Sequence, residues 1–167
     1  NVVEKFAGPG DVSLVVKPRL PDVHKGDFGR LLVIGGSEVF SGAPTLVALA
    51  ALRTGVDLTY IAAPQKTATT ISSMSPNVIT LKLEGAHLNP RNTVVIKRHL
   101  ETSTAVVMGP GLGLHKETED VVNEIIEMIE ERKIPLLLDA DGLKAFAKHK
   151  RKVKFPLVLT PHAGEYK

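Results

Sequence analysis

Short, continuous apolar runs alternate with helical patterns along most of this chain, and this alternation restricts the possible folds more than any other feature. Strands are predicted at residues 31–34, 58–62, 77–83, 105–108, 135–138 and 155–160. Helices are predicted at residues 44–54, 91–100, 117–132 and 142–149. Because strands that alternate with helices are joined by right-handed crossovers, the sequence predicts a three-layer α/β fold, with helices on both faces of a mainly parallel sheet.

The beginning of the chain has a different pattern. Proline and glycine interrupt residues 1–30, and one short apolar run at 12–16 predicts an additional edge strand. We interpret residues 1–19 as a linker or as the tail of a preceding domain, and residues 20–167 as the main domain.

The composition excludes several classes of protein. Of the 167 residues, 43% are hydrophobic, 23% are charged and none is cysteine. Disulfide bonds, thiolate metal sites and cysteine nucleophiles are thereby excluded. The apolar stretches are shorter than the roughly 20 residues needed to cross a bilayer, so we expect no membrane association and a cytoplasmic location.

The net charge of +3 is small, and the basic residues are densest at 148–154. Phe146 and Phe155 flank this run, but no stacking platform or nucleic-acid motif accompanies it. We therefore interpret the run as a solvated surface turn and expect no nucleic-acid partner.

Glycine-rich and polar segments follow several of the predicted strands, at residues 35–43, 109–113, 139–142 and 160–165. Because the carboxyl ends of parallel strands meet at one edge of a sheet, we expect these segments to lie together and to form a ligand site. Gly109, Gly111 and Gly113 either supply positive φ angles for a sharp turn or expose backbone N–H groups to a phosphate or a ring. The sequence leaves both interpretations open.

Individual side chains in these segments also have two interpretations. Asp139 ends a Leu-Leu-Leu run and is suited to holding a hydrated metal cation, with a role in the turn as the alternative. Asp141 either caps the following helix or binds a ligand, and Ser41 is expected to be a helix cap. His162 is either a turn residue or a substrate contact, with Glu165 three positions later.

Several standard motifs are absent. The Gly-x-Gly-x-Gly sequence at 109–113 lacks the Gly-x-Gly-x-x-Gly spacing of dinucleotide-binding proteins, and there is no Gly-x-x-x-x-Gly-Lys-Ser/Thr sequence. The chain also lacks a Gly-x-Ser-x-Gly elbow and a His/Glu spacing typical of zinc enzymes. An ordinary NAD dehydrogenase and a P-loop enzyme are therefore disfavoured.

Several motifs, taken together, resemble those of one family. Residues 24–30 (HKGDFGR), followed by a strand and by 35–37 (GGS) and 40–44 (FSGAP), resemble the opening of the ADP-dependent NAD(P)H-hydrate dehydratases of the ribokinase-like superfamily. Residues 109–113, 138–143 and 159–165 match the later motifs of that family in order and spacing. The resemblance extends from residue 20 to 167 and implies the N-terminal portion of a ribokinase-like domain, truncated on its C-terminal side.

The resemblance implies metabolite repair. The ring hydroxyl of hydrated NADH or NADPH would be phosphorylated at the expense of ADP, or of ATP in related enzymes, and phosphate would then be eliminated. Ala43, Gly113 and His162 would contact the hydrated nucleotide. Glu165 would organise Mg²⁺ and phosphate, and Asp139 is assigned to the same phosphate and metal chemistry. The implied cofactors are therefore Mg²⁺ and an adenine nucleotide.

Other parts of the family pattern are expected beyond Lys167: the loop that holds the adenylate phosphates and a Gly-x-Gly-Asp loop with the catalytic base. The chain alone is therefore expected to be inactive, and the apolar run at 155–160 is expected to be an interior strand. A homo-oligomer is expected, as is fusion behind an epimerase domain, which is common in prokaryotes. The alternatives are a vitamin-precursor kinase of the same superfamily, disfavoured by His162, and a non-catalytic nucleotide-binding module.

Overall fold

The computed structural model describes residues 6, 8–16, 18–148 and 152–165. In this part of the chain a six-stranded sheet with the order β3-β2-β1-β4-β5-β6 forms the central layer. Every neighbouring pair of strands is parallel. The strands are β1 Arg30–Ile34, β2 Leu58–Pro64, β3 Ile79–Leu83, β4 Ala105–Met108, β5 Leu136–Leu138 and β6 Leu157–Leu159. The parallel sheet predicted from the sequence is confirmed.

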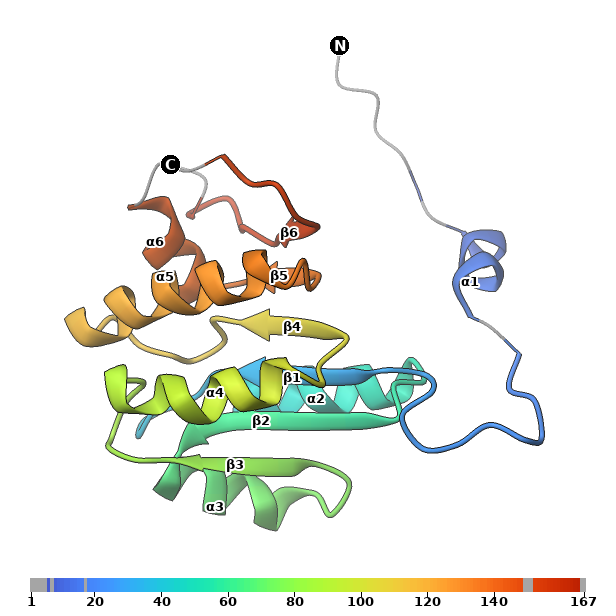
Figure 1. Cartoon of the computed structure of the whole chain (residues 1–167), viewed down its shortest axis with the longest axis horizontal. Helices are drawn as coiled ribbons and strands as arrows, with labels where there is room; N and C mark the ends of the chain where they lie inside the picture. Colours follow the sequence, from blue (N-terminus) through green and yellow to red (C-terminus); the bar gives the residue numbers. More distant parts are fainter. Residues whose placement is uncertain (1–5, 7, 17, 149–151, 166–167) are drawn as a thin grey trace.

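Helices cover both faces of this sheet (Figure 1). One face carries α2 (Gly42–Arg53) and α3 (Gln65–Met74). The other carries α4 (Thr93–Leu100), α5 (Lys116–Glu131) and α6 (Asp141–Ala147). A short 3-10 helix, η1 (Pro90–Asn92), leads into α4. Among the described residues, every helix is too short or too polar to cross a membrane.

Alternate side chains of the central strand enter the two apolar layers. Leu32 and Ile34 pack in the layer that contains Ile125 of α5, whereas Leu31 and Val33 pack in the layer that contains Ala48 of α2. A buried aliphatic side chain of this size stabilises the fold by about 1.5–3 kcal/mol. The continuous apolar run at 31–34 is therefore explained by helices on both sides of the strand.

The order of the strands creates a topological switch point at the carboxyl edge of the sheet. After β1 the chain forms β2 and β3 on one side and then crosses back to place β4 on the other side of β1. The connections that leave β1 and β4 therefore run to opposite faces, toward α2 and α5 respectively. Ligands of open α/β sheets bind at such a switch point.

The edge strand predicted at residues 12–16 is not found. Most of this run belongs to a helix, α1 (Pro9–Val15), which lies apart from the sheet (Figure 1). The helix begins with Pro9 in its first turn, and the Gly8 N–H donates to the Asp11 carboxylate (2.7 Å). A short apolar run has no periodicity that distinguishes a strand from one or two helical turns, which is why the prediction was wrong.

Helix α3 was not predicted. Its sequence is rich in threonine and serine, whose helix propensity is modest because they compete for backbone hydrogen bonds. Its buried residues Thr67, Ala68 and Ile71 lie on the face that packs against the sheet. Tertiary packing therefore determines this helix.

Asp57 connects the segment before β1 to the body of the fold. Its carboxylate accepts hydrogen bonds from the N–H groups of Phe28 (2.9 Å) and Gly26 (3.0 Å) and pairs with Arg19 (2.9 Å). The bond from Phe28, followed by those from Gly26 and Arg19, lowers the pKa of Asp57 below its ordinary value, although desolvation acts in the opposite direction.

Replacing Asp57 by asparagine is expected to lower the melting temperature at neutral pH. A carboxyl group whose pKa is lowered by folding adds stability above its unfolded pKa of about 3.9, and this stability is lost as the pH falls through the folded pKa. The difference in melting temperature between wild type and Asp57→Asn should therefore shrink between pH 7 and about pH 2. Asp22→Asn, at an exposed carboxylate, is the matched control. A difference that is constant with pH would contradict this role.

Candidate functional site at the carboxyl edge

The glycine-rich and polar segments lie together at the carboxyl edge of the sheet, as predicted. The Gly36 N–H donates to the Pro110 carbonyl (2.9 Å), which joins the segment after β1 to the segment after β4. The Gly113 N–H donates to the Asp141 carboxylate (2.9 Å), and the Thr160 hydroxyl donates to the Asp139 carboxylate (2.8 Å). Each segment is thus hydrogen-bonded to the next across the edge.

The glycines at 109 and 113 have different roles. Gly109 has a φ angle of +126°, and a Cβ atom there would lie 1.8 Å from the Asp139 carbonyl oxygen. It is therefore required for packing between the segments after β4 and β5. Gly113 also has a positive φ angle (+80°), but a Cβ atom there would meet nothing within 4 Å. Gly113 borders open space, which is what a ligand contact needs.

Asp141 does not cap α6, contrary to one of the interpretations above. It is the first residue of the helix, and Ala140 occupies the N-cap position with a φ angle of +48°. The Asp141 carboxylate instead joins two segments, because Oδ2 accepts the Gly113 N–H and Oδ1 accepts the Lys144 ammonium (2.9 Å). The hydrogen bond and charge of Asp141, with a further contribution from the charge of Glu165, raise the pKa of Lys144.

His162 and Glu165 form a compact loop after β6. The His162 N–H donates to Glu165 Oε2 (3.1 Å), and the Gly164 N–H donates to His162 Nδ1 (3.0 Å). Because Nδ1 accepts this bond, the neutral ring carries its proton on Nε2, which lies 3.5 Å from Glu165 Oε1. The His162 side chain is 73% exposed and that of Glu165 only 10%. His162 therefore helps to shape the turn and is also accessible to a ligand.

Ala43 is the second residue of α2, and its side chain is exposed. Ser41 occupies the N-cap position, as expected, but its side chain makes no capping hydrogen bond. Its carbonyl oxygen instead accepts the Thr45 hydroxyl (2.8 Å). Ala43, Gly113 and His162 thus lie on different segments of the same edge, and their contact with a ligand stays a prediction.

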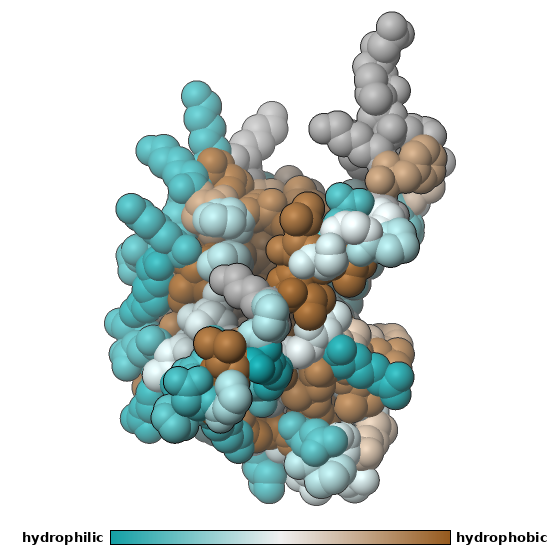
Figure 2. Space-filling view, turned by 90° about the vertical axis from the view of Figure 1, so that its right-hand side faces the viewer, coloured by the Kyte–Doolittle hydropathy of each residue, from teal (hydrophilic) through white to brown (hydrophobic). Residues whose placement is uncertain are grey.

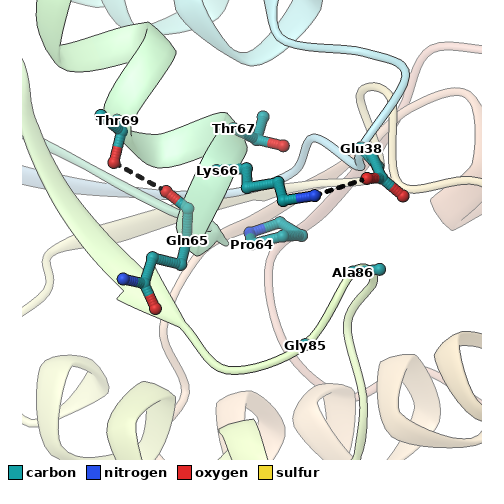
Figure 3. A pocket seen from close by; sticks show the side chains of 8 residues that line it. All are labelled: Glu38, Pro64, Gln65, Lys66, Thr67, Thr69, Gly85 and Ala86. Atoms are coloured by element: carbon teal, nitrogen blue, oxygen red, sulfur yellow. Dashed lines mark hydrogen bonds and ion pairs between the residues drawn. The ribbon is translucent and has the colours of Figure 1, made fainter.

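A cavity of about 570 Å³ lies beside the segment after β1 (Figure 3). It is lined by the first turn of α3, by Glu38 and by Gly85 and Ala86. Two of its lining residues form an ion pair, Lys66 Nζ with Glu38 Oε1 (3.2 Å), and both side chains are exposed. The sequence did not reveal this cavity because α3 was not predicted. Pro64 occupies the N-cap position of α3 and not the first helical position that proline favours.

Comparisons of sequence place this chain among known proteins. Residues 31–167 match the sequence model of the family described as NAD(P)H-hydrate dehydratase. The chain is 43% identical over 164 residues to a bifunctional NAD(P)H-hydrate repair enzyme of Pyrobaculum aerophilum, which covers 98% of this chain and 32% of that protein. It is 36% identical over 163 residues to an ATP-dependent (S)-NAD(P)H-hydrate dehydratase of Emericella nidulans. The match covers 91% of this chain and 44% of that protein.

Solved structures agree with this result. A hypothetical protein of Streptococcus mutans superposes with a TM-score of 0.80 at 27% identity, covering 93% of this chain and 54% of that one. A second solved structure is an ADP/ATP-dependent NAD(P)H-hydrate dehydratase of Bacillus subtilis, co-crystallised with ATP/Mg²⁺. It superposes with a TM-score of 0.71 at 25% identity, covering 94% of this chain and 52% of that one. The present chain thus spans about a third of the P. aerophilum relative and about half of these solved chains.

Proposed function

The chain belongs to the NAD(P)H-hydrate dehydratase family, and on this premise we propose that it supplies the substrate-binding side of an enzyme that restores NADH and NADPH from their hydrated forms. In the proposed reaction a phosphoryl group is transferred to the ring hydroxyl, and the hydroxyl oxygen then leaves with phosphate as a ring proton is lost. The observation that carries the proposal is that the segments holding Ala43, Gly113 and His162 lie along the same carboxyl edge, where each segment is hydrogen-bonded to the next.

His162 and Gly113 have contacts that suit this role. In its neutral form His162 presents the Nε2 proton at an exposed ring, so it can donate a hydrogen bond to an oxygen of the hydrated ring. The Gly113 N–H is already bonded to Asp141. Gly113 would therefore contribute shape, because the open space next to its Cα admits a ligand ring that a side chain would exclude.

We assign Asp139 and Glu165 to Mg²⁺ and phosphate, with Glu165 as the metal ligand. Mg²⁺ in proteins is held by one or two carboxylates and completes its coordination with waters and substrate phosphates, so this donor set fits. Bound Mg²⁺ would neutralise charge on the transferring phosphoryl group. Glu165 is prepared for this role because its carboxylate is held against the His162 backbone N–H.

The phosphate donor is proposed to be ADP or ATP, since the E. nidulans relative is named ATP-dependent and the B. subtilis relative ADP/ATP-dependent. A Gly-x-Gly-Asp sequence does occur in this chain, at residues 8–11. It lies at the start of α1, on the side of the sheet away from the ligand-binding segments (Figure 1). We therefore propose that the general base and the donor-phosphate loop come from other residues of the complete enzyme.

Apolar side chains are exposed on the side of the molecule that carries α1 (Figure 2). Val12, Leu14 and Val15 of this helix are 59%, 83% and 78% exposed. We propose that the complete protein buries this surface, against a preceding epimerase domain or within a homo-oligomer. The name of the P. aerophilum relative, a bifunctional repair enzyme, supports a fused second domain.

His162→Ala tests the proposed function in the complete enzyme. The change should weaken binding of NADH hydrate about tenfold or more, because losing one buried polar contact costs about 1–3 kcal/mol. The melting temperature should change little, because the side chain is 73% exposed. Calorimetric titration with NADH hydrate, without a phosphate donor, measures the affinity, and His99→Ala on α4 is the matched control. A sharp drop in melting temperature with unchanged affinity would make His162 a structural turn residue.

A further inference from the structure

Two imidazoles and a carboxylate from distant parts of the sequence meet beside the N-terminal end of α5. His87 lies between β3 and η1, whereas His115 and Glu117 lie at the start of α5. One ligand atom from each of these three side chains lies within 4.8 Å of the others. His87 Nε2 is 3.1 Å from Glu117 Oε2, and the two imidazole rings are stacked with centroids 3.8 Å apart and planes at 22°.

The backbone holds these side chains together. The Thr118 hydroxyl donates to the Leu88 carbonyl (2.9 Å), and both residues are 1% exposed. Thr118 directly follows Glu117, and Leu88 directly follows His87, so this buried bond fixes the two segments at the point where the three side chains emerge. The Asn89 side-chain amide also donates to the His87 carbonyl (3.0 Å). The cluster is therefore built on a fixed backbone.

An ion pair alone does not account for the cluster. The ion pair involves only His87 and Glu117, whereas His115 is stacked on the face of the His87 ring. A cation bound by two neutral imidazoles and one carboxylate uses all three groups, once the stacked rings turn so that their in-plane nitrogen lone pairs converge on it. The positive end of the α5 dipole acts against a cation, but the Glu117 carboxylate offsets it. His87 and Glu117 line a small pocket that Arg91 also borders. The Arg91 guanidinium is paired with Glu84 (2.7 Å).

We propose that His87, His115 and Glu117 bind a divalent late transition-metal ion, with Zn²⁺ as the reference case. Two histidines and one glutamate, with a fourth position open to water, form a donor set that Zn²⁺ accepts in tetrahedral geometry. The bound ion would connect the segment after β3 to residue 115, two positions after Gly113. It would therefore restrain the segment that carries Gly113. This proposal does not depend on the proposed function.

Titration of the metal-free complete protein with Co²⁺ and then Zn²⁺ tests the proposal. We expect one equivalent of Co²⁺ to give the intense visible bands of tetrahedral coordination and Zn²⁺ to displace it. His115→Ala should weaken Zn²⁺ binding by about 100-fold or more, since even outer-shell partners of metal ligands contribute about 10–100-fold. Zn²⁺ should raise the melting temperature of the wild type and not of His115→Ala.

Several variants make the outcome decisive. Glu117→Gln keeps the shape of the side chain and should also weaken binding, so it replaces His115→Ala if that variant does not fold. His99→Ala, a histidine near Tyr60 and outside the cluster, should bind as the wild type does. Glu165→Gln distinguishes metal binding at this cluster from binding at the proposed magnesium ligand, because this variant should leave the tetrahedral bands unchanged. Absence of these bands, or their persistence in both His115→Ala and Glu117→Gln, would overturn the proposal.

Discussion

Gly109→Ala is expected to destabilise the protein severely. The φ angle of +126° is one that a side chain rarely adopts, and the new Cβ atom would lie 1.8 Å from the Asp139 carbonyl oxygen and 2.8 Å from the Gly142 nitrogen. Backbone strain of about 1–3 kcal/mol would add to overpacking of about 1–3 kcal/mol. Their sum is a large part of the roughly 5–15 kcal/mol by which a typical domain is stable. Denaturant unfolding measures the loss.

Gly113→Ala is the matched control, because Gly113 also has a positive φ angle (+80°) but no atom lies within 4 Å of the added Cβ. It should cost about 1–2 kcal/mol from the backbone conformation alone. Its main effect should be on binding of NADH hydrate, since the methyl group would occupy the proposed ligand space. Equal destabilisation by the two variants would show that the close approach of Gly109 to Asp139 is not the cause of the loss of stability.

The isolated 167-residue chain is expected to regenerate no NADH from NADH hydrate, ADP or ATP, and Mg²⁺. Phosphoryl transfer needs a group that activates the acceptor and a cradle for the donor phosphates, and both are proposed to lie outside this chain. The predicted interior strand at 155–160 appears as β6 at the edge of the described sheet, where Val158 and Leu159 are 55% and 44% exposed. We therefore also expect the isolated chain to aggregate readily.

The complete enzyme under the same conditions is the positive control for this assay. Circular dichroism of the isolated chain shows whether the fold persists, so that inactivity is not confused with unfolding. Recovery of NADH absorbance by the isolated chain would place the base within these residues, with Asp139 and Asp141 as the first candidates. It would refute the proposed division of the active site.

The strands were predictable because a central parallel strand is apolar on both faces. The run at 105–108 matches β4 residue for residue, and the amphipathic pattern at 117–132 agrees with α5 to within one residue at each end. The meeting of the ligand-binding segments followed from topology, because parallel strands carry their following connections to the same edge. Where local pattern and tertiary packing disagree, as in α3, the prediction failed.

The roles of individual residues could not be predicted in the same way. Asp141 and Gly113 are 28 positions apart, and their hydrogen bond depends on the start of α6 lying against the end of β4. The difference between Gly109 and Gly113 likewise depends on which backbone passes nearby. Sequence spacing does not encode such contacts between segments, because they arise from how the connections fold back over the edge of the sheet.

The sequence by itself determined the layered parallel fold, the edge of the sheet that carries the ligand-binding segments, and the family. These properties depend on local periodicity and on motifs that are contiguous in the chain. Only the tertiary structure decided that Asp141 accepts a hydrogen bond from Gly113 and that Gly109 is tightly packed whereas Gly113 borders open space. It also brought His87 close to His115 and Glu117. These contacts join residues far apart in sequence, and the energy that selects them comes from packing of the whole domain.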